Sequence, residues 1–293
     1  MGSLDGKVAI VTGAGGGLGR SHALLLAHEG AAVVVNDLGG DRHGAGGGTS
    51  MADGVVAEIE AAGGKACAHY GSVTDSEAAA GMVKTAVDTF GRLDILINNA
   101  GILRDRSFKK MSDEEWDSVI DVHLRGTYLV TKHAWQQMLD QAEGGRIIMT
   151  SSTSGLIGNF GQANYGAAKA GVAGFMRVLA LEGMKSGITV NVLAPAALSR
   201  MTEDIMPDVP ELGERLAPEK VSPAIVWLCT DDAAKITGRQ FCITGNRVSL
   251  LSWQVDVIAE KDALDGPWTV AEVGDAIAST TENWPKLLTP MQV

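Results

Sequence analysis

The segment Lys7–Glu29, KVAIVTGAGGGLGRSHALLLAHE, contains three patterns in the order that decides the fold. Residues 7–12 form a short apolar run, residues 13–17 are a glycine cluster, and residues 18–29 have a helical pattern. The segment therefore predicts a strand, a tight turn and a helix. Because glycine has no side chain, such a turn lets the backbone approach a pyrophosphate at the positive end of the helix.

The glycine turn has the pattern Thr12-Gly-x-x-x-Gly-x-Gly. We take as candidate dinucleotide-binding residues Gly13, Gly17, Leu18 and Gly19. A flexible turn without a ligand would have a similar composition. The strand expected before the turn and the helix expected after it favour the binding site.

A second apolar run, residues 31–36, ends at Asp37, about twenty residues after the glycines, where a dinucleotide fold places an acid on the adenosine ribose. The carboxylate would repel a ribose 2′-phosphate, so Asp37 predicts NAD rather than NADP as cofactor. Arg42 and His43 in the glycine-rich insert 38–50 could weaken this exclusion. The alternative role of Asp37 is to cap a loop.

The rest of the chain continues to alternate helical patterns with apolar runs. Expected helices are 51–62, 75–90, 112–140, 163–185 and 222–229, and expected strands are 65–70, 93–97, one starting at 147, 189–193 and 240–244. This alternation predicts an α/β fold, a doubly wound Rossmann-type parallel sheet of about seven strands. We expect a single domain, residues 1–249, followed by an apolar C-terminal extension, residues 250–293, that packs on the body or on a neighbouring subunit.

The candidate catalytic residues are Ser152, Tyr165 and Lys169, in a stretch that opens as a strand and continues as a helix. Tyr165 and Lys169 are four residues apart, so a helix places them on one face. A nearby ammonium would lower the tyrosine pKa from about 10 toward neutrality, and Ser152 would hydrogen-bond the oxygen of an alcohol or carbonyl. This trio suits reversible alcohol oxidation. Alone, Tyr-x-x-x-Lys is better explained by an ordinary amphipathic helix with a solvated lysine. The spacing from Ser152 and the glycine-rich start of the chain favour the catalytic interpretation.

Composition excludes several classes of function. The 293 residues carry a net charge of −11, which disfavours a nucleic-acid partner. Cys67, Cys229 and Cys242 have no metal-ligand spacing, so we expect reduced thiols and no metal site. No apolar run approaches the length of a membrane span, and the N-terminus lacks a signal-peptide pattern. We therefore expect no membrane partner and a cytoplasmic location.

Four motifs together resemble the short-chain dehydrogenase/reductase family over roughly residues 5–245: the glycine turn, Asn98-Asn-Ala-Gly, Ser152 and Tyr165-x-x-x-Lys169. The resemblance implies an NAD-dependent oxidoreductase in which Tyr165 exchanges a proton and Lys169 binds the nicotinamide ribose. It implies further cofactor contacts at Ser72, Val73, Asn99, Ala100, Gly101 and Leu198, although Ser72 stands where many relatives have an adenine-binding aspartate. The helix pairing of the family implies a homodimer or homotetramer.

Other segments, including Asn36-Asp-Leu-Gly-Gly-Asp41 and Gly158-Asn-Phe-Gly-Gln-Ala-Asn-Tyr165, are similar to the (3R)-hydroxyacyl-CoA dehydrogenase region of peroxisomal multifunctional enzymes. This similarity implies an acyl-CoA substrate. A 17β-hydroxysteroid dehydrogenase, a 3-oxoacyl reductase and an idle dinucleotide-binding protein are the alternatives. Candidates for binding the CoA phosphates are the basic residues Arg104, Arg106, Lys109 and Lys110.

His123 stands where the family usually has an asparagine that completes a proton relay to the lysine through water, which makes it a fourth candidate catalytic residue. A histidine can carry such a relay, but with a reference pKa of about 6.5 it can also become charged. A packed core histidine is the alternative. Residues 201–216 are polar and interrupted by prolines, which predicts a mobile segment over the binding site or a surface loop.

Overall fold

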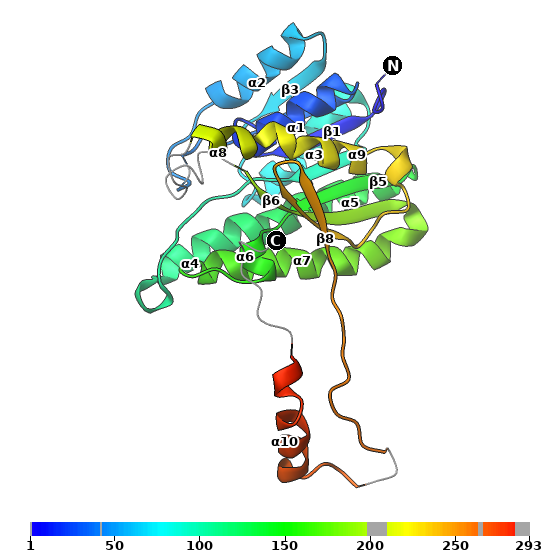
Figure 1. The fold of residues 1–293 in the computed structure, drawn as a ribbon. Coiled ribbons are helices and arrows are strands. Elements are labelled where there is room, and N and C mark those ends of the chain that lie inside the picture. The colour runs from blue at the N-terminus through cyan, green and yellow to red at the C-terminus, as the bar shows by residue number, and fades with distance from the viewer. Residues whose placement is uncertain (1, 42, 198–209, 263–265, 285–293) are drawn as a thin grey trace.

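The computed structural model describes residues 2–41, 43–197, 210–262 and 266–284 (Figure 1). Within these ranges, eight strands form one sheet in the order β3-β2-β1-β4-β5-β6-β7-β8. The strands are β1 (Val8–Thr12), β2 (Ala32–Asn36), β3 (Lys65–His69), β4 (Ile95–Asn98), β5 (Gly145–Thr150), β6 (Ile188–Ala196), β7 (Gln240–Thr244) and β8 (Arg247–Leu251). The first seven are parallel, and β8 is antiparallel to β7.

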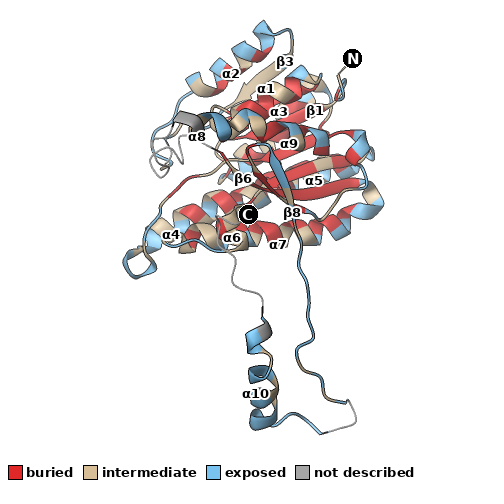
Figure 2. Cartoon of the chain, in the orientation of Figure 1, coloured by how far each residue is buried: buried red, intermediate tan, exposed pale blue. Residues whose placement is uncertain are grey.

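Helices cover both faces of the sheet (Figure 1). One face holds α1 (Gly17–His28), α2 (Ser50–Ala61) and α9 (Ser222–Leu228), and the other holds α3 (Ser76–Phe90), α5 (Thr127–Gln141) and α7 (Ala163–Gly183). In β1, Val11 packs toward the first set and Ile10 toward the second. The central strands are thus buried on both faces, as Figure 2 shows, which explains their continuous apolar runs. The doubly wound α/β fold is confirmed.

The eighth strand was not expected. It forms a hairpin with β7 in which Thr244 pairs with Arg247, so only Gly245 and Asn246 lie in the turn. Gly245 has φ +56°, a conformation that glycine adopts without steric cost. The expected end of the main domain, after residue 249, therefore falls inside a strand of the sheet.

The helix expected over residues 112–140 follows one path but changes geometry within it. It consists of α4 (Asp113–Ile120), a π-helical turn η2 (Asp121–Gly126) and α5. Ser112 caps α4 in a reciprocal capping box with Glu115. The π-helical turn contains His123, and such turns are frequent at functional sites.

The C-terminal extension departs from the body after β8, and its helix α10 (Val270–Ala278) stands apart from the sheet (Figure 1). Trp253 anchors its start, since the Arg177 guanidinium lies 5.1 Å from the centre of its ring. Further along, Val255 and Val257 are 92% and 76% exposed. The described part of the extension is therefore largely exposed rather than packed on the body, and packing on a neighbouring subunit remains a prediction.

Residues 201–209 of the expected mobile segment lie outside the described residues. The following residues form a short helix, α8 (Pro210–Arg215), rather than a loop. In the part of the chain that the structure describes, no helix is both long and apolar enough to cross a bilayer.

Candidate active site

The candidate site lies where the carboxyl ends of β1, β2 and β4 meet. The chain crosses from β3, on one side of β1, to β4 on its other side, so the strand order reverses at β1 and β4. Open α/β sheets bind ligands in the crevice at such a switch point. A cavity of about 470 Å³ opens there, walled by the segments that follow these strands.

Nine predicted cofactor residues line this cavity: Gly13, Gly17, Leu18, Asp37, Ser72, Val73, Asn99, Ala100 and Gly101. Gly19 packs beneath the turn, where an added Cβ would lie 2.2 Å from the carbonyl oxygen of Gly13. Leu198 and Arg42 lie outside the described residues. Leu38, Asp41, Ile102 and Arg104 also line the cavity, and sequence reasoning assigned none of them to the cofactor site.

The glycine turn and the Asn-Asn-Ala-Gly turn are locked together by hydrogen bonds. The Asn99 side-chain amide donates to the backbone oxygens of Thr12 and Gly13, at 3.0 and 3.1 Å. The Thr12 hydroxyl oxygen accepts from the N–H groups of Asn99 and Ala100, at 3.0 and 3.1 Å. Gly13 has φ +63°, and a Cβ there would lie 2.8 Å from the Ala100 Cα. This cradle of bare backbone fits a dinucleotide pyrophosphate. Sequence reasoning missed the part that Thr12 plays in it.

Asp37 fixes the loops around it through both carboxylate oxygens. Its Oδ2 accepts from the N–H of Gly15 at 2.8 Å, and its Oδ1 accepts from the N–H of Gly39 at 2.7 Å. The carboxylate therefore faces the cavity as a fixed negative group that can accept further hydrogen bonds from ribose hydroxyls. Asp37 can therefore cap the loops and bind the ribose at the same time, because its carboxylate oxygens can accept more than one hydrogen bond each.

Ser152 and Lys169 both lie close to Tyr165, which contacts the cavity wall through His123 and Ile102. Ser152 is the N-cap of the short helix α6 (Thr153–Leu156), and its Oγ accepts from the N–H of Ser154 at 3.1 Å. Because that bond uses the oxygen as acceptor, the hydroxyl hydrogen is left to donate, toward Tyr165 in the protein alone and toward the substrate oxygen when a substrate is bound. Lys169 is 3% exposed, its Nζ donates to the Thr150 carbonyl at 2.6 Å, and it lies 5.5 Å from the centre of the Tyr165 ring.

Burial shifts the two titratable groups of this trio. Burial raises the pKa of Tyr165 to about 12, with the Asp105 charge acting in the same direction and a hydrogen bond with Ser152 opposing it. Burial lowers the pKa of Lys169 to about 7. The sequence predicted a Tyr165 pKa lowered by Lys169. In the protein alone, desolvation outweighs this attraction, so a low tyrosine pKa requires added positive charge in the site.

His123 lies against Tyr165, with the two ring centres 5.0 Å apart and the rings nearly perpendicular. Its Nε2 is 2.7 Å from the Ile102 carbonyl oxygen and 3.1 Å from the Ile102 N–H. Nε2 can either donate to the Ile102 carbonyl or accept from the Ile102 N–H, but a single tautomer cannot do both. The contact with the carbonyl is the shorter of the two, which favours the tautomer that carries the proton on Nε2. Burial, followed by the Lys169 charge, lowers the pKa of His123 well below its usual value. The neutral imidazole is therefore favoured, and the charged form considered from the sequence is not.

The Nδ1 of His123 is buried and has no hydrogen-bond partner among the described residues. With Nε2–H donating to Ile102, Nδ1 is left as an acceptor. An acceptor at this position fits the water-linked relay better than it fits the core-packing alternative, in which a buried polar atom would lack a partner.

The four basic residues expected to bind CoA phosphates do not act as one cluster. Arg106 is engaged by Glu115, with its Nε and Nη2 donating to Oε1 at 3.0 and 2.8 Å. Arg104 lines the dinucleotide cavity. Lys109 and Lys110 are exposed on the turn η1 (Phe108–Lys110). Arg106 is exposed as well, but its guanidinium is already paired with Glu115.

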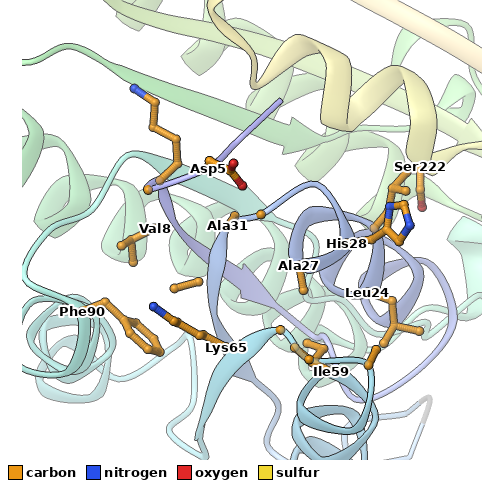
Figure 3. Close-up of a pocket in the computed structure, with 18 of the residues that line it drawn as sticks. Asp5, Val8, Leu24, Ala27, His28, Ala31, Ile59, Lys65, Phe90 and Ser222 are labelled. Carbon is orange, nitrogen blue, oxygen red and sulfur yellow. The ribbon is translucent and has the colours of Figure 1, made fainter. Parts of the chain in front are cut away.

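A larger cavity, of about 1220 Å³, lies at the opposite end of the strands (Figure 3). Its walls include Leu24 and His28 of α1, Ile59 of α2 and Phe90 of α3, and Figure 3 shows Lys65 beside Phe90. This cavity adjoins the amino ends of the strands, and no predicted catalytic or cofactor residue lines it. Judged by volume alone, the larger cavity would be the candidate active site. The predicted cofactor residues line the smaller cavity at the carboxyl ends of the strands, so we take the smaller one as the candidate site.

Comparison with known proteins agrees with this geometry. A family model described as short chain dehydrogenase matches residues 7–209. The chain is 51% identical over 283 residues to peroxisomal multifunctional enzyme type 2 of Mus musculus, covering 97% of this chain but 37% of that protein. It is 43% identical to hydroxyacyl-CoA dehydrogenase ChsB1 of Mycobacterium tuberculosis over 261 residues, covering 85% of this chain and 80% of that protein.

A solved structure gives the same result at the level of the fold. The crystal structure of a short chain dehydrogenase from Mycobacterium avium superposes with a TM-score of 0.85 at 44% identity and covers 98% of both chains. The chain thus belongs to the short chain dehydrogenase family, whose members are oxidoreductases.

Proposed function

We propose that this protein is an NAD-dependent dehydrogenase that interconverts a (3R)-3-hydroxyacyl-CoA and the corresponding 3-oxoacyl-CoA. The observation that carries the proposal is the meeting of Ser152, Tyr165 and Lys169 beside a cavity that fits a dinucleotide. An idle binding protein has no need to bury a lysine and a tyrosine together, because burial of such groups is costly. The name of the Mycobacterium tuberculosis relative supports the substrate class.

The chain's residues divide the reaction among them. NAD, when bound, supplies the nicotinamide ring that accepts a hydride. Ser152 donates a hydrogen bond to the reacting oxygen, and Tyr165 accepts the proton that the alcohol loses. Positive charge near the phenol favours its ionised form, so Lys169 contributes when protonated. With a pKa of about 7, the Lys169 ammonium loses its proton as the pH rises past neutrality.

Tyr165→Phe tests the chemical step. Because the phenyl group cannot exchange a proton, we expect turnover to fall at least about a hundredfold while NAD still binds. Turnover is measured by NADH absorbance and cofactor binding by calorimetry. Tyr128→Phe, on the exposed side of α5, is the matched control and should behave as the parent does. Near-normal turnover of Tyr165→Phe would refute the assignment.

Asp37 supports NAD rather than NADP. Its fixed carboxylate would repel a 2′-phosphate, so we expect a higher kcat/KM with NAD than with NADP. Asp37→Ala should lower the ratio of kcat/KM with NAD to kcat/KM with NADP by at least about tenfold. Because Asp37 also holds Gly15 and Gly39, part of the effect will appear as weaker binding of both cofactors. A loss that affects both cofactors equally cancels in the ratio of the kcat/KM values with NAD and NADP, so a change in this ratio reports the effect of the Asp37 charge. Equal efficiency with both cofactors in the parent would contradict the proposal.

The substrate class is tested with a panel of alcohols. We expect (3R)-3-hydroxyacyl-CoA to be oxidised far more efficiently than the (3S) isomer or a free 17β-hydroxysteroid. Replacing Lys109 and Lys110 together by serine should raise KM for the CoA ester and weaken its salt dependence, since exposed charge pairs are screened by salt. Turnover of the steroid alone, with no activity on any acyl-CoA, would transfer the proposal to a hydroxysteroid dehydrogenase.

Assembly and location are part of the same proposal. Exposed apolar residues on α5 and α7, among them Leu139, Val178 and Leu181, support a homodimer or homotetramer. A cytoplasmic location remains a prediction, and the peroxisomal name belongs to the relative.

A further inference from the structure

Two loops at the mouth of the active site lie side by side. One follows β4 and contains residues 104–106, and the other immediately precedes Tyr165 on α7. The N–H of Arg106 donates to the Gly161 carbonyl at 2.8 Å, and the Asn164 side chain donates to the Arg104 carbonyl at 3.1 Å. The loop from the cofactor side of the sheet is thus attached to the start of the catalytic helix.

Between these loops, a chain of hydrogen bonds leads from Asp105 to Ser152. The Gln162 Nε2 donates to Asp105 Oδ2 at 2.6 Å. The Ser154 hydroxyl donates to Gln162 Oε1 at 2.6 Å. The N–H of Ser154 in turn donates to Ser152 Oγ at 3.1 Å. The bond from Gln162 to the Asp105 carboxylate is short for an N–H···O bond, the other two have ordinary lengths, and the last one ends on a catalytic oxygen.

The carboxylate sets the direction of this chain. An ionised carboxylate only accepts hydrogen bonds, so Gln162 must turn its NH₂ group toward Asp105 and its oxygen toward Ser154. The Gln162 oxygen then accepts the Ser154 hydroxyl, and it also accepts from the Asn159 side chain at 3.2 Å. A neutral amide at position 105 would remove this constraint, because Gln162 could then point either way.

We propose that Asp105 is a positioning residue of the active site, which acts through Gln162 and Ser154 to hold the Ser152 hydroxyl as a hydrogen-bond donor toward the reacting oxygen. Asp105 itself acts at a distance, at the rim of the site. The inference rests on the proposed function, because it assigns a role in alcohol oxidation, but part of its test needs no substrate.

The charge of Asp105 has a second effect that separates this role from a merely structural one. Tyr165 faces three titratable groups: Lys169 from its own helix, His123 from the π-helical turn and Asp105 from the loop. The negative charge of Asp105 opposes loss of the Tyr165 proton. Partial desolvation raises the pKa of Asp105 itself, but Gln162 favours its ionised form. Removing the charge should therefore make Tyr165 more acidic.

The experiment compares Asp105→Asn, Ser154→Ala and the control Asp113→Asn. Asp113 is exposed in the first turn of α4, outside the chain of hydrogen bonds. For Asp105→Asn we expect kcat for the hydroxyacyl-CoA to fall about fivefold or more at little change in KM, and the acid limb of the kcat profile to move about half a pH unit lower. Ser154→Ala should lower kcat without moving the limb, since it keeps the charge. Asp113→Asn should match the parent.

A second measurement follows Tyr165 directly and needs no substrate. The chain has three tyrosines, so incorporation of 3-fluorotyrosine gives few ¹⁹F signals, and Tyr165→Phe identifies the one from Tyr165. Its titration midpoint should fall in Asp105→Asn and stay unchanged in Ser154→Ala and Asp113→Asn. If no alcohol is oxidised but this midpoint shifts as expected, the proposed function fails and the coupling of Asp105 to Tyr165 stands. A parental kcat in Ser154→Ala, or an unshifted midpoint in Asp105→Asn, would overturn the inference.

Discussion

His22 is a buried histidine outside the catalytic site. It is fully buried between α1 and α9, with Nδ1 2.8 Å from the Ser222 hydroxyl oxygen. Its Nε2 has no hydrogen-bond partner within the described ranges. Burial lowers its pKa to about 4, since a charged imidazole would lose its hydration there. The native state therefore holds His22 neutral, whereas the unfolded chain protonates it near its ordinary pKa of about 6.5.

This difference predicts acid sensitivity. As pH falls from 6.5 toward 4, the unfolded state binds a proton that the native state does not, so the free energy of unfolding falls by about 3 kcal/mol in total. His22→Gln cannot titrate, so between pH 7 and pH 5 it should lose about 2 kcal/mol less than the parent. Urea unfolding at both pH values measures this. Equal losses in His22→Gln and the parent would contradict the account.

The capping box of α4 offers a direct test of local stability. The Ser112 hydroxyl accepts from the N–H of Glu115 at 3.1 Å, and Glu115 Oε2 accepts from the N–H of Ser112 at 3.0 Å. We expect Ser112→Ala to lower the free energy of unfolding by about 1 kcal/mol. Ser107→Ala is the control, because Ser107 precedes the turn η1 without a capping hydrogen bond. Urea titrations should separate the two variants, and equal stability would mean that the cap contributes nothing net.

The sequence predicted most elements because their patterns are local. Residues 8–11 and 31–35 are apolar throughout because β1 and β2 are buried on both faces. β8 was missed because Val248 and Leu250 are exposed, so Arg247–Leu251 has no buried run. The two-residue turn Gly245-Asn246 was the available signal. The π-helical turn was missed because a single widened turn barely disturbs helical periodicity.

The candidate site was predictable in the same local sense. The glycine turn, Asp37, and the trio of Ser152, Tyr165 and Lys169 carry their chemistry in their spacing. Their pKa values were not predictable, because desolvation depends on how much of the folded protein surrounds each group. The contact between Gln162 and Asp105 joins residues 57 positions apart, and neither residue forms a motif alone. Such a contact becomes visible only when the loops are in place.

The C-terminal extension is the least buried part of the described chain. Trp253 holds its start against Arg177, whereas Val255, Val257 and Val270 are between 76% and 92% exposed. Isolated exposed apolar residues are ordinary, but a run of them along one arm marks a surface that another chain covers. We propose that the arm packs on a second copy of the protein.

A chain that ends at Leu251 tests this proposal. Since the arm contributes no residue to the buried core clusters of the body, the unfolding temperature should change little. The dissociation constant of the dimer should rise at least about tenfold, or about 1.4 kcal/mol, measured by analytical ultracentrifugation. The double variant Val255→Ser and Val257→Ser keeps the full length and should weaken the dimer in the same direction. An unchanged dissociation constant in both variants would remove the arm from the interface.

The pairing of β1 with β4 also bears on how the protein is made. Val8 at the start of β1 donates its N–H to the Asp94 carboxylate, 86 positions further along the chain, at 2.9 Å. The two walls of the dinucleotide crevice therefore come from segments that a ribosome releases far apart in time. A nascent chain that stops short of β4 carries the glycine turn and Asp37 but lacks Asn99 and the wall opposite. Only when the fourth strand has emerged and joined β1 can the growing polypeptide hold a cofactor.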